Sequence, residues 1–347
     1  MPTLFKYEKG IKFLKKPENL TLIADPTTVK AAENCDVTLI THAHTDHSLA
    51  FPNEGIKVYS TEIASQLFES LTARKTRNTK FIELNKTINI NDVEVKFIPA
   101  GHLLGAAQIV FYFDDLTICY TGDISTDKML TVPKAAVPED KVDILITEAT
   151  YGKGDLFFDS RERIKGSILK WVAENLQENK VPVINMGHLG PAQEIIAYLN
   201  DMLSVDIYCD NRTSEINKIY QNEGHNLQWN RFDLLNDSEL KAERSVVLLP
   251  RAAKEIPEFL KSHKISRGIV TGQASRFAYS SFEQAFPFSM HANCNELLEH
   301  VKAVNPQKVY TLYGFDSDFA AIVRQKLKLF ARPIKMSKNR LTLEEFL

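Results

Sequence analysis

Apolar residues in the first part of the chain recur in short runs that are rich in β-branched side chains and separated by turn residues, a pattern typical of strands. Asn91-Asp92, between two such runs, is typical of a hairpin turn. A helix is expected over about residues 60–71. The strand-like runs lie at 20–24, 37–41, 58–60, 87–90, 93–99, 108–113, 116–120 and 144–147.

The pattern changes after residue 150. Ile164, Ile168 and Trp171 are spaced as on one face of a helix over 160–175, and Pro191 suits the first turn of a helix that runs to about residue 199. Strands are expected between and after these helices, and alternation of this kind predicts a small α/β unit. The expected strands lie at 181–185, 205–209, 245–249, 268–271 and 308–312, with helices at 295–303 and 317–327 and a tail at 341–347.

The composition is that of a globular protein: 44% of the 347 residues are hydrophobic and 25% are charged. A core of this size needs no disulfide or structural metal, so a metal site would serve chemistry. The cysteines form no CxxC pair, which argues against a zinc ribbon or a disulfide framework. No segment approaches the ~20 apolar residues of a membrane span, so a soluble, cytoplasmic protein without a membrane partner is expected.

The formal net charge is −2, so a nucleic-acid partner would require a local basic patch. Arg74, Lys75, Arg77 and Lys80 form one candidate run, although such runs are more often solvated surface segments.

One loop carries an unusual density of metal-ligand side chains. His42, His44, Asp46 and His47 lie within six residues and follow the apolar run 37–40, with no bulky apolar residue between them. In a turn after a strand these side chains can converge on one point. Imidazole and carboxylate ligands together suit zinc, manganese or iron. The sequence therefore predicts a metal site here, whereas packing alone does not explain three histidines and an aspartate.

This HxHxDH pattern resembles the signature of the metallo-β-lactamase superfamily. Gly101-His102 after one strand and Gly122-Asp123 after another match the next two ligand positions of that family in order, and Asp25 matches an early aspartate. The resemblance implies that His42, His44 and His102 hold one metal, that Asp46 and His47 belong to a second, and that Asp123 bridges both. Two divalent ions, zinc by default with manganese possible, would then activate a water as the nucleophile.

Two further segments resemble motifs of the β-CASP nucleases within that superfamily. Glu148-Ala149-Thr150-Tyr151-Gly152 is similar to "(D/E).TYG", and Phe288–Asn293 with the following leucines is similar to "FS.HAD...L". The resemblance implies that Glu148 has a catalytic role near the metals and that His291 is a general acid. It also implies that Asp46 is both a metal ligand and a catalytic residue. Residues 190–194 are similar to the helix start "GRAQE".

The resemblance also implies the architecture. The expected fold is α+β: a four-layer αββα sandwich formed by residues 1–150 and 281–347, with a small α/β (β-CASP) domain inserted at 151–280. The layout is similar to short exonucleases associated with DNA ligases. The expected activity is therefore metal-dependent nuclease cleavage of nucleic-acid phosphodiesters, with a DNA exonuclease of repair or processing favoured over an RNA-processing exo- or endoribonuclease. Arg251, Arg276 and the 74–80 run are possible phosphate contacts.

Two positions depart from the family pattern. Tyr313, before Gly314, stands where a histidine usually ligates the second metal, so that metal is expected to bind weakly unless the tyrosine oxygen contributes. Pro191 replaces the arginine of "GRAQE", which removes one side-chain phosphate contact, although the helix start could still bind phosphate through backbone N–H groups. His188 could substitute, but is more commonly an ordinary loop histidine.

Two other functions stay open at this point. A non-catalytic β-CASP subunit would typically lack several ligands, whereas this chain keeps the core set; metal content separates the two. A glyoxalase or lactonase would share the metal loop but lack the segments around Glu148 and His291, and turnover of thioesters or lactones would reveal it. The oligomeric state is not readable from the sequence.

Overall fold

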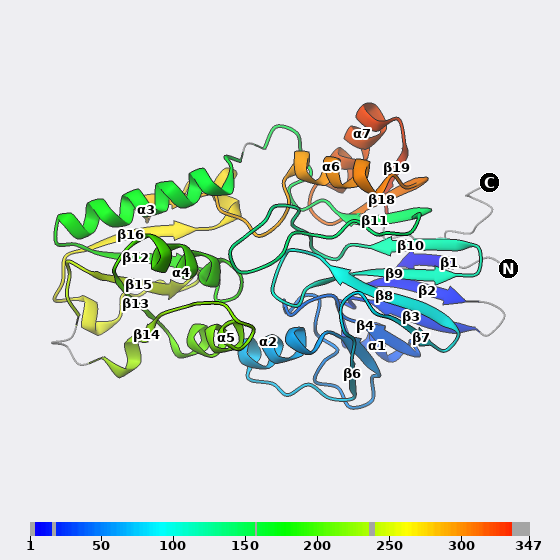
Figure 1. The fold of residues 1–347 in the computed structure, drawn as a ribbon, viewed down its shortest axis with the longest axis horizontal. Coiled ribbons are helices and arrows are strands. Elements are labelled where there is room, and N and C mark those ends of the chain that lie inside the picture. Colours follow the sequence, from blue (N-terminus) through cyan, green and yellow to red (C-terminus); the bar gives the residue numbers. More distant parts are fainter. Residues whose placement is uncertain (1–3, 16–18, 157, 236–239, 335–347) are drawn as a thin grey trace. The chain divides into compact units, whose positions relative to one another are not determined.

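The chain forms two compact units in the computed structural model, which describes residues 4–15, 19–156, 158–235 and 240–334 (Figure 1). The first unit comprises residues 1–128, 132–155 and 291–347, and the second comprises residues 129–131 and 156–290. The tail expected at 341–347 lies outside the described residues. The domain limits 1–150, 151–280 and 281–347 stay predictions.

The first unit contains two sheets. One has the strand order β1-β2-β3-β4-β5-β6 and the other β19-β18-β11-β10-β9-β8-β7. The strands of the first sheet are β1 (Leu4–Tyr7), β2 (Ile11–Lys15), β3 (Leu20–Ala24), β4 (Val37–Leu39), β5 (Val58–Ser60) and β6 (Thr79–Phe81). Those of the second are β7 (Thr87–Ile90), β8 (Val93–Pro99), β9 (Ala107–Phe113), β10 (Leu116–Tyr120), β11 (Ile144–Glu148), β18 (Lys308–Leu312) and β19 (Phe330–Pro333).

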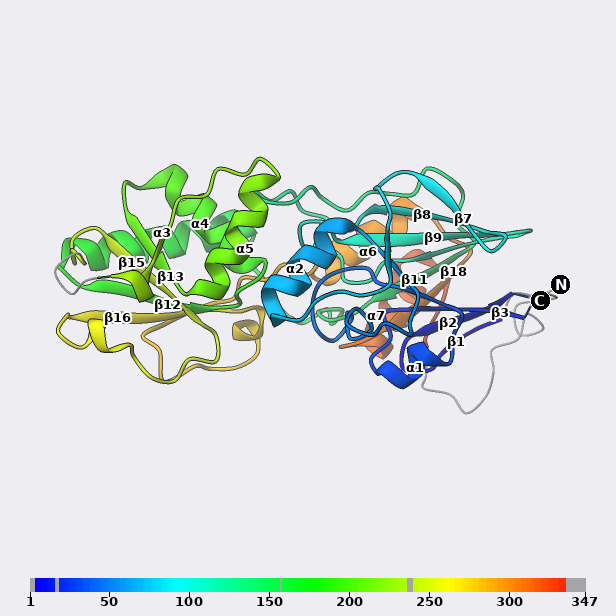
Figure 2. The ribbon, with the colours of Figure 1, turned by 90° about the horizontal axis from the view of Figure 1, so that it is seen from below.

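The core of this unit lies between the two sheets, which are seen nearly edge-on in Figure 2. Side chains alternate across a strand, so β9 sends Ile109 and Phe111 into this core and Val110 to the opposite face. The ring of Phe13 on β2 packs 4.4 Å, centroid to centroid, from that of Phe111. Burial of both faces of β9 explains its nearly continuous apolar sequence.

Helices cover the outer faces. α6 (Cys294–Val304) and α7 (Asp316–Leu327) pack on the second sheet through a separate apolar cluster that includes Leu297 and Phe319, and α1 (Val29–Glu33) lies outside the first sheet (Figure 2). α2 (Glu62–Thr72) follows β5. The layers therefore run helix, sheet, sheet, helix, which confirms the expected α+β four-layer αββα sandwich.

The second unit is an α/β unit built on one sheet of six parallel strands in the order β14-β13-β15-β12-β16-β17. Its elements are α3 (Arg161–Gln177), β12 (Val181–Met186), α4 (Pro191–Met202), β13 (Asp206–Cys209), α5 (Asn211–Asn222), β14 (Asn230–Arg231), η1 (Phe232–Leu234), β15 (Ser245–Pro250), η2 (Glu258–Leu260), β16 (Ile265–Val270), η3 (Gly272–Ser275) and β17 (Gln284–Phe286).

A buried ion pair fixes residues 129–131 to this second unit. Glu194, on α4, lies 3.1 Å from the Lys165 ammonium and accepts hydrogen bonds from the backbone N–H groups of Leu130 and Thr131. A buried carboxylate is tolerated when it is paired and hydrogen-bonded in this way. The glutamate of the "GRAQE"-like segment is therefore structural in this chain.

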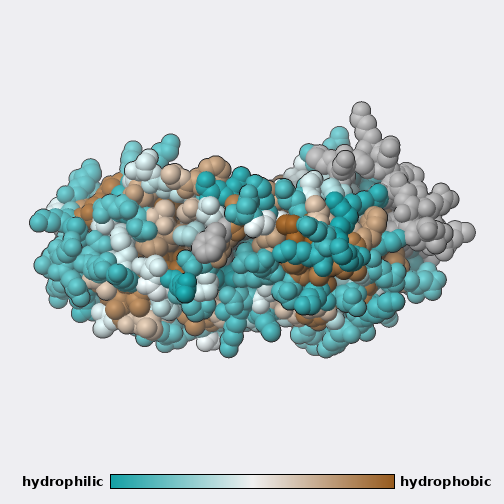
Figure 3. All heavy atoms as spheres, turned by 90° about the horizontal axis from the view of Figure 1, so that it is seen from above, coloured by the Kyte–Doolittle hydropathy of each residue, from teal (hydrophilic) through white to brown (hydrophobic). Residues whose placement is uncertain are grey.

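The surface is largely hydrophilic on the face drawn in Figure 3, where hydrophobic residues form small separate areas. Within the described part of the chain, no helix combines the length and the apolar composition needed to cross a bilayer.

His300 on α6 makes the stability of the first unit depend on pH. Its side chain is buried, its Nε2 has no hydrogen-bond partner among the described residues, and burial lowers its pKa to about 4. The unfolded chain takes up this proton near pH 6.5, whereas the folded chain resists it until about pH 4, so acidification favours unfolding. Between pH 6.5 and pH 5, we expect this group alone to remove about 1.5 kcal/mol of stability.

His300→Leu tests this expectation, because leucine fills similar space and cannot be protonated. The difference in unfolding free energy between variant and parent should grow on acidification when unfolding of the first unit is followed by circular dichroism. Both tryptophans, Trp171 and Trp229, lie in the second unit, so the transition seen by tryptophan fluorescence should not move. A variant that loses stability with acid as steeply as its parent would contradict the assignment.

Candidate metal centre

The predicted ligands lie on three loops at one edge of the sandwich. The loop after β4 carries His42, His44, Asp46 and His47, and the loops after β8 and β10 carry His102 and Asp123. β3 and β4 run parallel in one sheet, and β8 and β10 share a direction in the other because each pairs antiparallel with β9. The carboxyl ends of these strands therefore deliver the side chains to a common edge.

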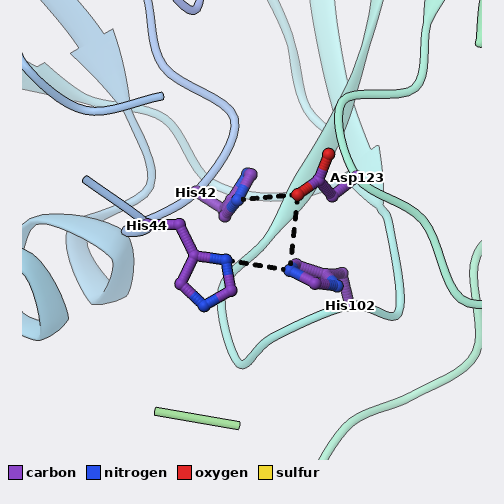
Figure 4. A group of neighbouring side chains, drawn as sticks. All are labelled: His42, His44, His102 and Asp123. Atoms are coloured by element: carbon purple, nitrogen blue, oxygen red, sulfur yellow. Dashed lines mark hydrogen bonds and ion pairs between the residues drawn. The ribbon is translucent and has the colours of Figure 1, made fainter. Parts of the chain in front are cut away.

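Four of these side chains converge closely (Figure 4). The candidate ligand atoms of His42, His44, His102 and Asp123 all lie within 4.8 Å of one another. Asp123 Oδ2 is 3.4 Å from His42 Nε2 and 3.7 Å from His102 Nε2, and the facing nitrogens of His44 and His102 are 3.1 Å apart. Burial, with the neighbouring histidines, holds the pKa values of His44 and His102 well below the usual range, so both rings are neutral.

The hydrogen bonds around His42 show that this arrangement suits a cation. Thr41 has one hydroxyl proton, which it donates to Asp25 Oδ2 at 2.6 Å, so its oxygen accepts a bond from His42 Nδ1–H at 2.9 Å. The lone pair of His42 therefore lies on Nε2, which is buried and has no hydrogen-bond partner among the described residues. Two acceptors, this nitrogen and Asp123 Oδ2, thus face each other, as the ligands of a divalent metal do.

A second group of donors adjoins the first. His47 Nε2 lies 3.6 Å from Asp123 Oδ1 and 3.7 Å from Asp46 Oδ2. Burial by itself lowers the pKa of His47, but Asp123 and Asp25 outweigh it and raise that pKa to about 10. Asp46 is less tightly placed: its side chain is 78% exposed and belongs to none of the close donor groups.

Asp25 links the two groups from behind. This buried carboxylate accepts hydrogen bonds from the Thr41 backbone N–H at 2.8 Å, from His47 Nδ1 at 2.9 Å and from the Tyr120 hydroxyl at 2.9 Å, in addition to the Thr41 hydroxyl. It thereby directs His47 Nε2 toward Asp123, as partners of metal-ligating histidines commonly do. Sequence reasoning missed Thr41 and Tyr120: the first adjoins the histidine loop, but a tyrosine within a buried strand carries no recognisable signal.

Gly122 allows Asp123 to approach the histidine loop. It adopts φ +55°, and a Cβ at this position would lie 2.7 Å from Thr41 Oγ1. Glycine adopts this conformation without steric cost and leaves room for the threonine.

Tyr313 lies beside His47, with ring centroids 5.7 Å apart. Burial and the Asp25 carboxylate hold the pKa of Tyr313 well above its usual value, which keeps the hydroxyl protonated. A phenolate ligand would have to give up this proton.

Glu148 and His291 form a pair next to Asp123. Glu148 is fully buried at the end of β11, and its two carboxylate oxygens lie 3.0 and 3.1 Å from His291 Nδ1. The backbone N–H of Ile124 donates to the same carboxylate at 2.8 Å. Burial alone lowers the pKa of His291, but Glu148 and Asp123 outweigh it and raise that pKa to about 9. His291 Nε2 faces the donor cluster, 3.9 Å from Asp123 Oδ2.

Members of these groups line one cavity of about 320 Å³ in the first unit. Hydroxyl-bearing Thr27 and Thr150, neither identified from the sequence, share its wall with Tyr313 and Gly314. The remaining lining residues are His44, Asp46, His47, Asp123 and His291. The cavity wall therefore combines donors for a cation, the His291 imidazole and neutral hydroxyls.

The other sequence candidates are not among the residues that line this cavity. In the 74–80 run, Lys75 lies 2.7 Å from Glu69 and Arg77 lies 3.8 Å from Glu54, so two of its four charges are paired. Arg251, Arg276, His188 and Pro191 belong to the second unit. Gln193 of the "GRAQE"-like segment caps α4, accepting a hydrogen bond from Gly190 N–H at 2.8 Å.

Comparison with known proteins gives a matching family and several relatives. Residues 11–157 match the beta-lactamase superfamily domain. A probable DNA ligase of Opitutus terrae is 26% identical over 294 residues, which cover 83% of this chain and 28% of that protein. A probable RNase of Methanocaldococcus jannaschii is 28% identical over 305 residues, or 79% of this chain and 69% of the relative. The endoribonuclease ysh1 of Aspergillus fumigatus is 28% identical over 198 residues, which cover 48% of this chain and 22% of that protein.

The chain thus spans well under half of the Opitutus and Aspergillus proteins. The crystal structure of a protein of unknown function from Enterococcus faecalis V583 superposes on 99% of this chain and 100% of its own chain, with a TM-score of 0.69 and 12% sequence identity. This likeness supports the fold. The matched domain contains the donor cluster, and relatives that extend over most of the chain include an RNase, so residues 11–157 belong to the metallo-β-lactamase superfamily.

Proposed function

We propose that this protein is a metal-dependent nuclease that hydrolyses nucleic-acid phosphodiester bonds, acting as a DNA exonuclease in repair or processing. The observation that carries this proposal is that His44 and Asp123 of the four-donor cluster and His291 of the Glu148–His291 pair line one cavity. A metal centre alone would also serve a lactonase, but a histidine held by a buried carboxylate beside that centre supplies the proton that an alkoxide leaving group needs.

The chain's own residues have distinct roles in this proposal. His42, His44 and His102 would hold one divalent ion and Asp46 and His47 a second, and Asp123 would contribute its carboxylate beside both sets of ligands. When bound, such ions supply Lewis acidity, which makes a water nucleophilic near neutral pH and offsets phosphate charge. Asp25 fixes His47, and through Thr41 also fixes His42, so that each presents Nε2.

His291 is the general acid in this scheme. Its Nδ1–H donates to Glu148, and its Nε2–H points toward the donor cluster and delivers a proton to the departing oxygen. Glu148 is a positioning residue: it accepts from Ile124 N–H as well as from His291, which fixes the ring, and its charge favours the protonated imidazole.

The relatives give grounds for both kinds of nucleic acid. The probable DNA ligase of Opitutus matches 83% of this chain, which favours DNA. The RNase J-like, RNase and ysh1 relatives favour an RNA-processing exo- or endoribonuclease as the alternative. The substrate test uses end-labelled single- and double-stranded DNA and RNA with zinc, manganese or magnesium. Stepwise shortening of DNA would support the proposal; cleavage of RNA alone would select the alternative; failure to cut any strand with any metal would refute both.

Tyr313 is expected to leave the second metal position short of one ligand, because burial and the Asp25 carboxylate keep its hydroxyl protonated. Tyr313→His should therefore raise metal content toward two ions per chain, measured by elemental analysis after dialysis against a fixed zinc concentration. Tyr313→Phe is the matched control, since it removes the hydroxyl without adding a ligand. Equal metal content in the parent and in Tyr313→His would contradict this expectation.

A further inference from the structure

The chain returns from the second unit to the first at His291. The residues that follow it are held within the first unit. Ala292 N–H donates to the Ile124 carbonyl oxygen at 2.7 Å, and Asn293 pairs with Tyr151 in an isolated parallel bridge. The orientation of the His291 ring therefore also depends on what fixes the chain on its upstream side.

Arg161 holds the chain on that upstream side. Its Nε–H donates at 3.1 Å to the backbone carbonyl oxygen of Ser289, two residues before His291. Arg161 and Ser289 both belong to the second unit, and they are 7% and 8% exposed. A hydrogen bond from a charged donor is shorter and stronger than one between neutral groups. The peptide group that leads to His291 is therefore fixed by a buried guanidinium.

The position of Arg161 is unfavourable for its own helix, so local structure does not explain it. Arg161 is the first residue of α3, whose N-cap Ser160 accepts a hydrogen bond from Arg163 N–H at 3.3 Å. The helix dipole disfavours a positive charge at this end, and burial adds a desolvation cost. Arg163, in the same turn, avoids the second cost, because it is exposed and lies 3.5 Å from Asp159. Departures of this kind from the local rules are typical of functional positions.

α3 also packs on the segment that leads to His291. Trp171, on α3, packs edge-to-face on Phe286 of β17, with ring centroids 5.8 Å apart and an angle of 68° between the rings. Phe286 is buried, and its carbonyl oxygen accepts a hydrogen bond from Phe288 N–H at 2.8 Å. The helix therefore contacts this segment at two points, at Trp171 and at Arg161, and supports it along its length.

We propose that Arg161 is a positioning residue for His291: by holding the Ser289 carbonyl group, it fixes the main chain that carries the imidazole. The inference rests on the proposed nuclease function, in which His291 is the general acid. Glu148 fixes the ring through Nδ1, whereas Arg161 fixes the backbone behind it. A catalytic group has to be held within about 0.5 Å of its working position, and a displacement of about 1 Å costs ~10²-fold in rate.

The first test is a double-mutant cycle with His291. Arg161→Met keeps an apolar stem of similar length but removes the donors, and it should lower kcat for nucleic-acid hydrolysis by ~10–100-fold with a smaller change in KM. In the His291→Ala background the same substitution should have no further effect. It should also leave hydrolysis of bis(p-nitrophenyl) phosphate unchanged, because that leaving group needs no proton.

Two variants serve as comparisons in this cycle. Arg161→Gln should recover part of the loss, because its Nε2–H lies as far along the side chain as the arginine Nε–H. Arg163→Met removes the same charge from the same helical turn and should change neither rate. Trp171 fluorescence checks that α3 stays packed in each variant. Arg161→Lys, which has no donor at the Nε position, provides the same measurements if Arg161→Met does not fold.

The second test does not require activity. In protein labelled with nitrogen-15 at histidine, the Nδ1–H signal of His291 in the NMR spectrum is identified by its loss in His291→Ala. This signal should shift or broaden in Arg161→Met and stay in place in Arg163→Met.

Three results would overturn the proposal: equal losses on the two substrates, a loss that adds to that of His291→Ala, or an unchanged His291 signal in Arg161→Met. A loss that Arg161→Gln does not relieve at all would also contradict the role of the Nε donor. If the parent cuts no nucleic acid, the nuclease assignment fails, and the His291 signal then decides by itself whether Arg161 positions this ring.

Discussion

Asp123→Ala is expected to abolish phosphodiester hydrolysis, with a loss of at least ~10³-fold in kcat/KM. Asp123 lies within 4 Å of His42, His47, His102 and His291, so its removal affects both proposed metal positions at once. Metal content by elemental analysis should fall together with activity. The secondary structure should persist, because the sandwich core lies between the sheets and does not include this side chain.

Asp114→Ala is the matched control. Asp114 is exposed between β9 and β10, at the opposite end of the strand that leads to Asp123, so its loss should leave activity and metal content unchanged. His44→Ala should reproduce the effect of Asp123→Ala. Full activity in either the Asp123 or the His44 variant would show that the donor cluster is not the catalytic centre.

His291→Ala is expected to slow nucleic-acid hydrolysis by ~10²–10⁴-fold in kcat with a smaller change in KM. The reason is that an alkoxide leaving group needs a proton, whereas a p-nitrophenolate does not. Hydrolysis of bis(p-nitrophenyl) phosphate should therefore be much less affected. Glu148→Gln should act in the same direction, since it removes the charge that holds the protonated ring.

The comparison between the two substrates shows whether His291 acts as a general acid or only supports the structure of the site. Equal losses on both would mean that His291 supports the metal centre and does not donate the proton. His263→Ala, at a partly exposed histidine of the second unit, is the control and should change neither rate.

The sequence by itself determined much of the local structure and the candidate chemistry. β18 occupies the predicted residues 308–312, and Asn91 and Asp92 form the predicted turn between β7 and β8. Such elements are specified locally, by the period of apolar positions and by turn residues. β1, β2 and α5 were not predicted. β1 and β2 have only 4 and 5 residues, and α5 is mostly polar along its length, so in each case the local signal is weak.

How the candidate residues act depends on contacts between distant parts of the chain. Sequence spacing cannot show that Tyr120, on a buried strand 95 residues away, donates to Asp25. Nor does it show that the "GRAQE"-like glutamate holds residues 130 and 131. Hydrogen bonds and ion pairs act over about 3–4 Å in space. The pattern along a chain, in contrast, reports only on neighbours in sequence. Which distant side chains meet depends on the order and direction of the strands.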